Sequence, residues 1–312
     1  MPAPPSNSPP DPAPAGRTSL AGLAYALAAF GVWGAFPIYF KALAPTSPLE
    51  VVCHRIIWSV PVVALMLHRH HAWGQWLEAL KSPRVRRTLV LSALLVSGNW
   101  LGFVYAVESG QVLQSSLGYF INPLVNVVLS MVFLGERLRP WQKASVLLAL
   151  AGTLTLALGH GQAPWLALYL AFSFALYGLL RKQVAIDALG GLLAETLFLA
   201  PASLACLVWL AARGELAFAN AGWRLSLFLL AGGVVTSLPL VWFTRATRRI
   251  SLTTVGICQY ITPSLHLALA VFAYGEAFGA AHLAAFGLIW LGLALFMGEL
   301  FLDLHRQRQP AA

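Results

Sequence analysis

Polar side chains recur at helical spacing in two apolar stretches of the chain that lie 140 residues apart. In the first stretch, SLGYFINPLVN, the residues Tyr119, Asn122 and Asn126 follow one another at intervals of three or four, so they share one helix face. The second stretch, ICQYITPSLH, carries Gln259, Tyr260, Thr262 and His266. Such groups hydrogen-bond small molecules, which predicts a binding site with two walls. Hydrogen bonding between packed helices is the alternative.

A proline occupies the same place in each stretch, Pro123 in the first and Pro263 in the second. Proline lacks a backbone donor and frees a carbonyl of the preceding turn. We therefore expect a local helix break at each proline, which would serve substrate binding or gating.

Two charged residues interrupt apolar runs at equivalent positions, Arg55 and Glu195. A buried arginine suits an anionic or carboxylate-bearing ligand, although Arg55 could instead reach back to the surface near Glu50. Glu195 is the candidate carrier of a coupling proton, or a counter-ion. Asn99 adds an amide to the predicted site, and Trp58 and Trp100 add apolar surface.

Signatures of catalysis are missing from the sequence. No lysine follows a glycine, so there is no GK[ST] phosphate loop, and neither HExxH nor GxSxG occurs. The three cysteines are scattered, and the HRHH run at 68–71 is expected to be a solvated cap. We therefore predict no catalytic residues, no metal and no cofactor.

The composition identifies the solvent of these segments as lipid. Hydrophobic residues make up 59% of the 312 residues, and charged residues only 10%, against about 25% in ordinary globular domains. A span needs about 20 apolar residues. Such runs predict ten transmembrane helices, at roughly 19–40, 49–67, 88–107, 112–134, 143–159, 164–180, 190–212, 225–244, 252–274 and 281–302.

The net charge of +9 reflects loops at a membrane surface, not a nucleic-acid site, because the basic residues lie in the gaps between apolar runs. With both termini inside, the cytoplasmic loops collect most of the Lys and Arg residues: Arg17, Arg69, Lys81, Arg84, Arg86, Arg87, Arg137, Arg139, Lys143, Arg181, Lys182, Arg245, Arg248, Arg249, Arg306 and Arg308. The outer side keeps Lys41, Arg213 and Arg224. The asymmetry predicts cytoplasmic termini.

The 140-residue offset relates the two halves of the chain as internal repeats. It also matches Gly135-Glu136 with Gly275-Glu276, and Gly152 with Gly292. The predicted units are a disordered proline-rich cytoplasmic tail at 1–17, a five-helix repeat at 18–160, a second at 161–304 and a short cytoplasmic tail at 305–312. Five spans per repeat invert the second repeat relative to the first, as in many secondary transporters.

The chain resembles the RarD-type permeases of the EamA group, within the drug/metabolite transporter superfamily. The motifs that carry the resemblance are LEVVCHRIIWSVP, GNWLGFVYAVESG, SSLGYFINPLVNVVLSMVFLGERL, ETLFLAP and TSLPLVWFTRATRRISLTTVGICQYITP. The resemblance implies ten helices in two inverted halves, a bacterial inner membrane and transport of drugs or metabolites.

Together these features predict an exporter that moves a small polar or amphipathic metabolite or drug by alternating access. Its partners would be that substrate and the lipid bilayer, with protons as the candidate coupling ion; a homodimer stays open. The alternative is a membrane-embedded enzyme that acts on lipid-linked substrates.

Overall fold

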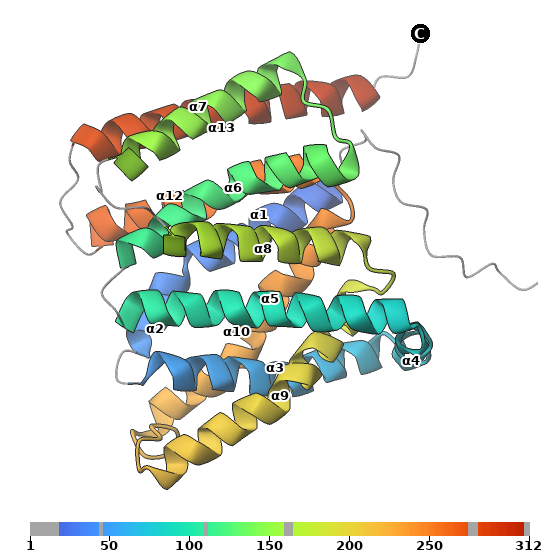
Figure 1. Cartoon of the computed structure of the whole chain (residues 1–312), viewed down its shortest axis with the longest axis vertical. Helices are drawn as coiled ribbons and strands as arrows, with labels where there is room; N and C mark the ends of the chain where they lie inside the picture. The colour runs from blue at the N-terminus through green and yellow to red at the C-terminus, as the bar shows by residue number, and fades with distance from the viewer. Residues whose placement is uncertain (1–18, 44–45, 109–111, 159–164, 274–279, 309–312) are drawn as a thin grey trace, which may run out of the picture.

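A computed structural model describes residues 19–43, 46–108, 112–158, 165–273 and 280–308, and within these residues every regular element is a helix (Figure 1). The predicted tail at 1–17 and the predicted repeat boundary at 160 lie outside the described residues. The helices are α1 (Leu20–Gly34), α2 (Phe36–Ala42), α3 (Pro48–Arg69), α4 (Trp73–Lys81), α5 (Pro83–Glu108), α6 (Val112–Leu134), α7 (Pro140–Leu158), α8 (Trp165–Gln183), α9 (Ala188–Ala212), α10 (Trp223–Thr247), α11 (Leu252–Cys258), α12 (Ile261–Ala268), the π-helix η1 (Leu269–Ala273) and α13 (Ala280–Arg308).

These elements form the ten predicted helical segments, two of which are divided. The first segment comprises α1 and α2, and the ninth comprises α11, α12 and η1. The short helix α4 was not predicted from the sequence. The predicted tail at 305–312 needs correction, because α13 continues to Arg308.

Side chains close the starts of several helices, where the first backbone N–H groups have no partner within the helix. The hydroxyl of Ser47 accepts a hydrogen bond from the amide of Glu50, and Pro48 follows at the first helical position. Asp187 accepts from two amides at the start of α9, and Ser251 accepts from the amide of Thr254 at the start of α11. These caps fix where the spans begin.

The two proline-containing segments differ in their backbones. The helix α6 runs through Pro123 without interruption, whereas α11 ends at Cys258 and α12 begins at Ile261, just before Pro263. Of the two expected breaks, the described helices therefore show only the one near Pro263. A further division separates α1 from α2 at Ala35.

The two halves pack with a two-fold pattern. The starts of α3, α5, α6 and α7 recur 140 residues later as the starts of α9, α10, α11 and α13. The helix α1 packs on α10 as α8 packs on α5, and α3 packs on α10 as α9 packs on α5. The colour gradient of Figure 1 shows that counterparts such as α3 and α9 run in opposite directions. The repeats are therefore inverted relative to each other.

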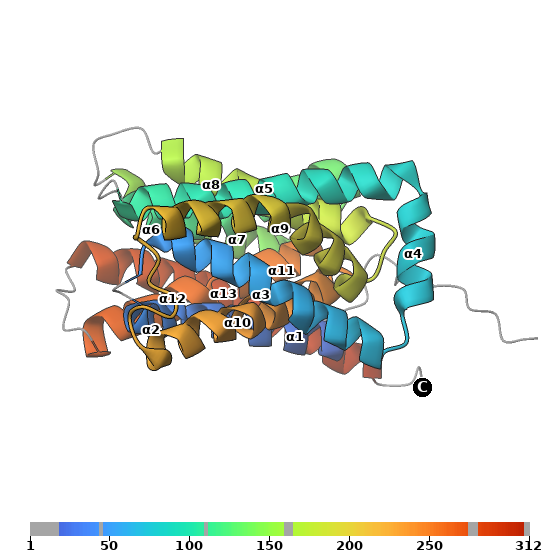
Figure 2. The same cartoon turned by 90° about the horizontal axis from the view of Figure 1, so that it is seen from below.

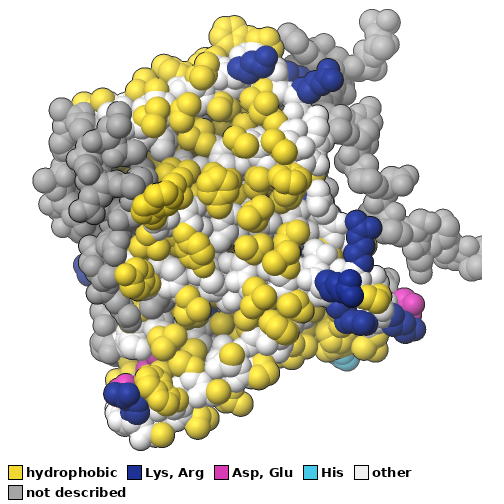
Figure 3. Space-filling view, in the orientation of Figure 1, with side chains coloured by type: hydrophobic (Ala, Val, Ile, Leu, Met, Phe, Trp, Pro, Cys, Tyr) yellow, Lys and Arg dark blue, Asp and Glu magenta, His cyan; other side chains and the backbone are white. Residues whose placement is uncertain are grey.

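One end of the molecule carries α4, which lies across the ends of the long helices, and the last turns of α13 (Figure 2). We call this the α4 end, and the other the α2 end. Lys and Arg side chains visible in Figure 3 gather mainly at the α4 end, with a smaller group at the opposite end.

Large apolar side chains cover the surface between the two ends (Figure 3). Exposed ones include Val132, Leu147, Leu204 and Phe228, which fits lipid as the surrounding solvent. Within the described residues, five helical stretches are long and apolar enough to cross a membrane by length and composition: Leu20–Ala42, Pro48–Arg69, Ala188–Ala212, Trp223–Thr247 and Leu283–Leu302.

The helices α7 and α13 meet through a pair of equivalent glycines. A Cβ atom on Gly152 would lie 2.6 Å from the carbonyl oxygen of Ala285, and one on Gly292 would lie 2.8 Å from that of Ser145. The four residues obey the 140-residue offset, so the contact is itself two-fold. Small residues of this kind let helix backbones approach closely in a membrane.

Substitution of Gly152 by alanine tests this contact. The added methyl group would push against helix backbone, so Gly152→Ala is expected to lower the free energy of unfolding by about 1–3 kcal/mol. Gly287→Ala is the matched control, because a Cβ atom at Gly287 would meet nothing within 4 Å. Thermal unfolding in detergent measures both, and equal midpoints would contradict the close backbone approach.

Candidate functional site

The buried arginine Arg55 lies seven residues after the start of α3, at about 10 Å from the α2 end at 1.5 Å per residue. Its Nε donates a hydrogen bond of 2.8 Å to the hydroxyl of Thr236 in α10. Its guanidinium carbon lies 5.0 Å from the ring centroid of Trp100, and 5.6 Å from those of Phe36 and Phe40. Arg55 thus joins α2, α3, α5 and α10 through contacts that stabilise a cation without an acid.

Some of the predicted site residues gather around this arginine. Trp100 contacts it directly, and the phenols of Tyr39 and Tyr119 lie within electrostatic reach of it. Trp58 does not join them, because its indole donates to Nδ1 of His54 on the α2 side. We call Arg55, Thr236, Phe36, Phe40, Trp100, Tyr39 and Tyr119 the Arg55 cluster.

The predicted amides lie deeper and bind helices to one another. Asn126 donates to the side-chain oxygens of Asn122, at 3.1 Å, and of Gln259, at 3.3 Å, which links α6 to the interruption between α11 and α12. Asn122 donates to the carbonyl of Ala171 in α8. Asn99 donates to the carbonyl of Leu170 and to Ser173, also in α8. In this conformation these amides fulfil the helix-packing role that was the alternative to binding.

The second predicted wall also reaches helix carbonyls. Tyr260 donates to Phe120 in α6, at 3.2 Å, and Thr262 donates to Phe30 in α1, at 2.9 Å. One ring nitrogen of His266 lies 3.1 Å from the carbonyl of Trp33, while its ring faces Tyr119 at 6.0 Å between centroids. His266 therefore connects the second wall to the Arg55 cluster through Tyr119.

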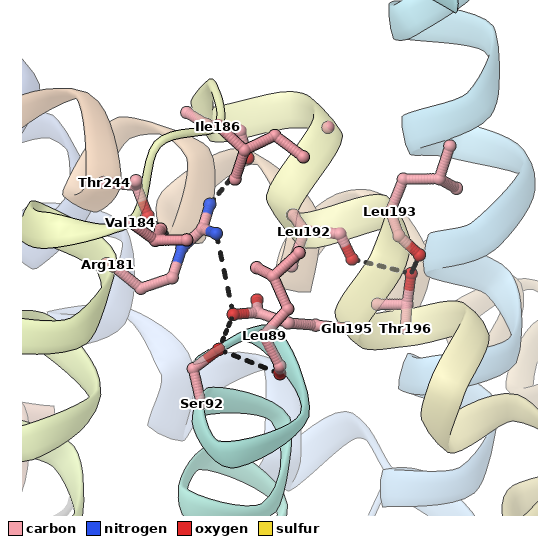
Figure 4. Close-up of polar contacts among 12 residues, drawn as sticks. Leu89, Ser92, Arg181, Val184, Ile186, Leu192, Leu193, Glu195, Thr196 and Thr244 are labelled. Carbon is pink, nitrogen blue, oxygen red and sulfur yellow. Dashed lines mark hydrogen bonds and ion pairs between the residues drawn. The ribbon is translucent and has the colours of Figure 1, made fainter. Parts of the chain in front are cut away.

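The acid Glu195 lies seven residues after the start of α9, which places it as far from the α4 end as Arg55 lies from the α2 end. Its carboxylate lies 3.7 Å from Arg181 in α8 and accepts a hydrogen bond from Ser92 in α5 (Figure 4). Arg55 and Glu195 do not pair with each other, because each charge enters from a different end and meets other partners.

Arg181 is fully buried and belongs to a site that the sequence did not reveal. Its Nη2 donates to the carbonyl of Ala188 at 3.0 Å, and its Nε lies 3.5 Å from the hydroxyl of Thr244. Because Arg181 stands at the end of an apolar run in the sequence, we expected it to lie in a cytoplasmic loop. Gly191 makes room for this side chain, since a Cβ atom there would clash with the guanidinium. We call Arg181, Glu195, Ser92 and Thr244 the Arg181–Glu195 cluster.

This second cluster keeps unused hydrogen-bonding capacity. Nη1 of Arg181 lies in the 3.7 Å ion pair, and the phenol of Tyr177 lies near the carboxyl group of Glu195, but neither Nη1 nor the buried Oε2 of Glu195 has a hydrogen bond of good geometry among the described residues. A buried oxygen without a donor is costly while the group is ionised. A proton on that oxygen would change the balance of charge in the cluster, so the arrangement suits proton binding.

Two further acids hold the ends of the bundle. Glu50 is buried at the α2 end and accepts hydrogen bonds from the amides of Ala217 and Phe218, in the segment between α9 and α10. At the α4 end, Glu136 accepts from the amides of Leu252 and Thr253. Glu136 therefore closes the start of α11.

Metal binding finds no support among the described residues, which contain no group of three or more His, Cys, Asp or Glu side chains placed to hold an ion. The Arg55 cluster and the Arg181–Glu195 cluster, near opposite ends of the molecule, can bind a ligand through charge, hydrogen bonds and aromatic contact.

Replacement of Arg181 by methionine tests the buried pair. Arg181→Met leaves Glu195 ionised and buried without its partner, and is expected to cost about 3–5 kcal/mol in unfolding free energy. The double variant Arg181→Met/Glu195→Met should regain most of that loss, because it removes both charges. Arg213→Met, in the exposed pair with Glu215, is the control and should change stability by less than about 1 kcal/mol. An additive double variant would contradict the pairing.

Comparison with known proteins agrees with this architecture. Residues 20–158 match the EamA-like transporter family. The chain is 45% identical to an "Uncharacterized transporter" of Vibrio cholerae over 275 residues, which cover 88% of this chain and 91% of the relative. It is also 45% identical to "Protein RarD" of Salmonella typhi, over 88% of this chain and 94% of that protein.

A crystal structure of a protein with 22% sequence identity superposes on 89% of this chain and 98% of its own, with a TM-score of 0.66, and so shares the fold. The relatives at 45% identity, aligned over nearly their whole length, decide the family. The chain is a multi-pass membrane protein that belongs to the RarD-type permeases of the EamA-like transporter family.

Proposed function

We propose that this protein is a secondary transporter that exports a small polar or amphipathic metabolite or drug across the bacterial inner membrane by alternating access. The observation that carries the proposal is the placement of the two charged clusters. Arg55 and Glu195 lie at equal depths from opposite ends, in two halves whose helix packing is two-fold and inverted. Such a fold has two related conformations, each open to one side.

In this proposal the Arg55 cluster receives the substrate. Its guanidinium holds a polar group, and the rings of Trp100 and Phe36 contact the apolar part. Asn122, Asn126 and Gln259, which bind helix carbonyls and one another in this conformation, would exchange those partners for the substrate as the halves move.

The Arg181–Glu195 cluster is the proposed coupling site. While Glu195 is ionised, it ties α9 to α8 through Arg181 and to α5 through Ser92. A proton on Glu195 would remove the attraction to Arg181 and weaken that tie. Proton binding would then favour separation of α8 and α9, the step that opens the α4 end.

Basic side chains support the proposed orientation, with the α4 end in the cytoplasm. Arg248 donates to the carbonyl of Val184 at 3.2 Å, and Lys182 donates to those of Thr247 and Ile250, so the bonds that close this end use positive charges. Lys and Arg residues accumulate on the cytoplasmic side of membrane proteins.

Sided flux in proteoliposomes tests the transport proposal. A panel of metabolites and drugs is first screened by thermal shift on the purified protein, and the hits are assayed for flux. Accumulation driven by a pH gradient is expected for the native chain. In Glu195→Gln it should fall to background, while exchange of labelled for unlabelled substrate persists, because the variant cannot lose or gain the proton. Glu215→Gln, at an exposed acid, is the control.

Ligand binding without flux in any direction would contradict the transporter. Chemical turnover of a lipid-linked substrate would favour the membrane-embedded enzyme instead. Loss of exchange together with accumulation in Glu195→Gln would show that Glu195 is needed for translocation itself and would contradict a role confined to coupling.

Labelling of single cysteines tests the orientation. In a background without Cys53, Cys206 and Cys258, His70→Cys lies at the α4 end and Ala221→Cys at the α2 end. An impermeant maleimide added to spheroplasts should label position 221 at once, and position 70 only after the membrane is opened. The reverse pattern would invert the proposed topology.

A further inference from the structure

The guanidinium of Arg55 has a wall of aromatic rings around it and one neutral hydrogen-bond partner. The side chain is only 8% exposed, and its one recorded hydrogen bond runs from Nε to the hydroxyl of Thr236. The three rings within 5.6 Å belong to Phe36, Phe40 and Trp100. Among the described residues, the two terminal nitrogens of this arginine find no acceptor.

The two fully placed acids of the buried spans, Glu50 and Glu195, have partners other than Arg55. Glu50, on the same helix, accepts hydrogen bonds from Ala217 and Phe218. Glu195 lies toward the opposite end with Arg181 and Ser92. Among the acids whose side chains the structure describes, none lies within 4 Å of Arg55, whereas the buried Arg181 has a carboxylate at 3.7 Å. Arginines buried to this degree are ordinarily paired, so the partner of Arg55 is to be sought in a ligand.

We propose that the Arg55 cluster selects organic monoanions, in which one carboxylate is joined to a flat apolar group, over zwitterions and cations. This inference rests on the proposed function, because it names the class of substrate for the same cluster. It goes beyond that function by excluding compounds whose ammonium group would need an acid in the site.

The charges and shapes of the cluster support each part of this selectivity. The free terminal nitrogens of an arginine match the two oxygens of a carboxylate in a planar, bidentate arrangement. A single fixed positive charge balances one negative charge, so a monoanion leaves the buried site neutral, whereas a dianion does not. Flat groups pack well against aromatic rings such as Trp100.

An ammonium group would gain nothing in the same place. The described cluster offers it no carboxylate, and the guanidinium repels it. The hydroxyls of Tyr39 and Tyr119 could accept a hydrogen bond from it, but carry no charge to balance it. The zwitterion therefore pays for the loss of water around its ammonium group without a compensating ion pair.

Three compounds with the same phenyl group and two-carbon chain isolate the role of charge: phenylpropanoate, phenylalanine and phenethylamine. At neutral pH they are an anion, a zwitterion and a cation. Saturable thermal shifts of the purified full-length protein measure their binding. Phenylpropanoate is expected to bind about 10- to 100-fold more tightly than the other two, as for a charge-assisted bidentate contact.

Variants of the arginine locate the effect. Arg55→Gln should abolish the preference for phenylpropanoate. Arg55→Lys should keep part of it, because lysine retains the positive charge but lacks the two parallel N–H donors of a guanidinium. Arg213→Gln, at an exposed arginine on the same end of the molecule, should bind like the native chain. If Arg55→Gln is not monodisperse, the Lys variant and the native chain still measure the preference.

The outcomes separate the inference from the proposed function. Equal binding of phenylalanine and phenylpropanoate, or an unchanged preference in Arg55→Lys and Arg55→Gln, would overturn the selectivity while leaving transport untouched. Tight, Arg55-dependent binding of phenylpropanoate without flux in proteoliposomes would support the anion site and refute the transporter.

Discussion

The absence of water between the two surfaces of a membrane governs this structure. Each polar group within the spans must find its partner inside the protein, because lipid offers none. Asn122, Asn126 and Gln259 largely meet this requirement by bonding to one another and to a helix carbonyl, although Oδ1 of Asn126 has no partner among the described residues. Where the chain is interrupted at residues 259–260, Tyr260 and Thr262 bind carbonyls of α6 and α1. Polar contact between helices is thus the condition for an irregular backbone at this depth.

The same constraint sets Arg55 and Arg181 apart from the other basic residues. Arg181 meets it with a carboxylate, a carbonyl and a hydroxyl, all supplied by the protein. Arg55 meets it only in part, with one hydroxyl and three rings. The two buried arginines thus have unequal partners, which breaks the symmetry of the halves and, in the proposed mechanism, separates the substrate site from the coupling site.

Much of the fold followed from the sequence, because lipid thickness imposes a length on every span and the 140-residue offset ties the halves together. The helix α4 was missed, since it is short and lies in a basic loop. The spacing of Tyr119, Asn122 and Asn126 correctly placed them on one face of α6, but spacing says nothing of what lies opposite. Their partners in α8 and α11 depend on tertiary packing. Arg181 was missed for the same reason, because its burial depends on Gly191 in another helix.

The glycine contact between α7 and α13 has a mechanical consequence for the whole molecule. These helices, one from each half, touch backbone to backbone through Gly152 and Gly292, and their remaining contacts are chiefly with α6 and α11. Because no side chain separates the two backbones at these glycines, α7 and α13 cannot move apart there without losing the contact. We therefore expect α7 and α13 to move together as one pair in any movement that exposes the two ends in turn.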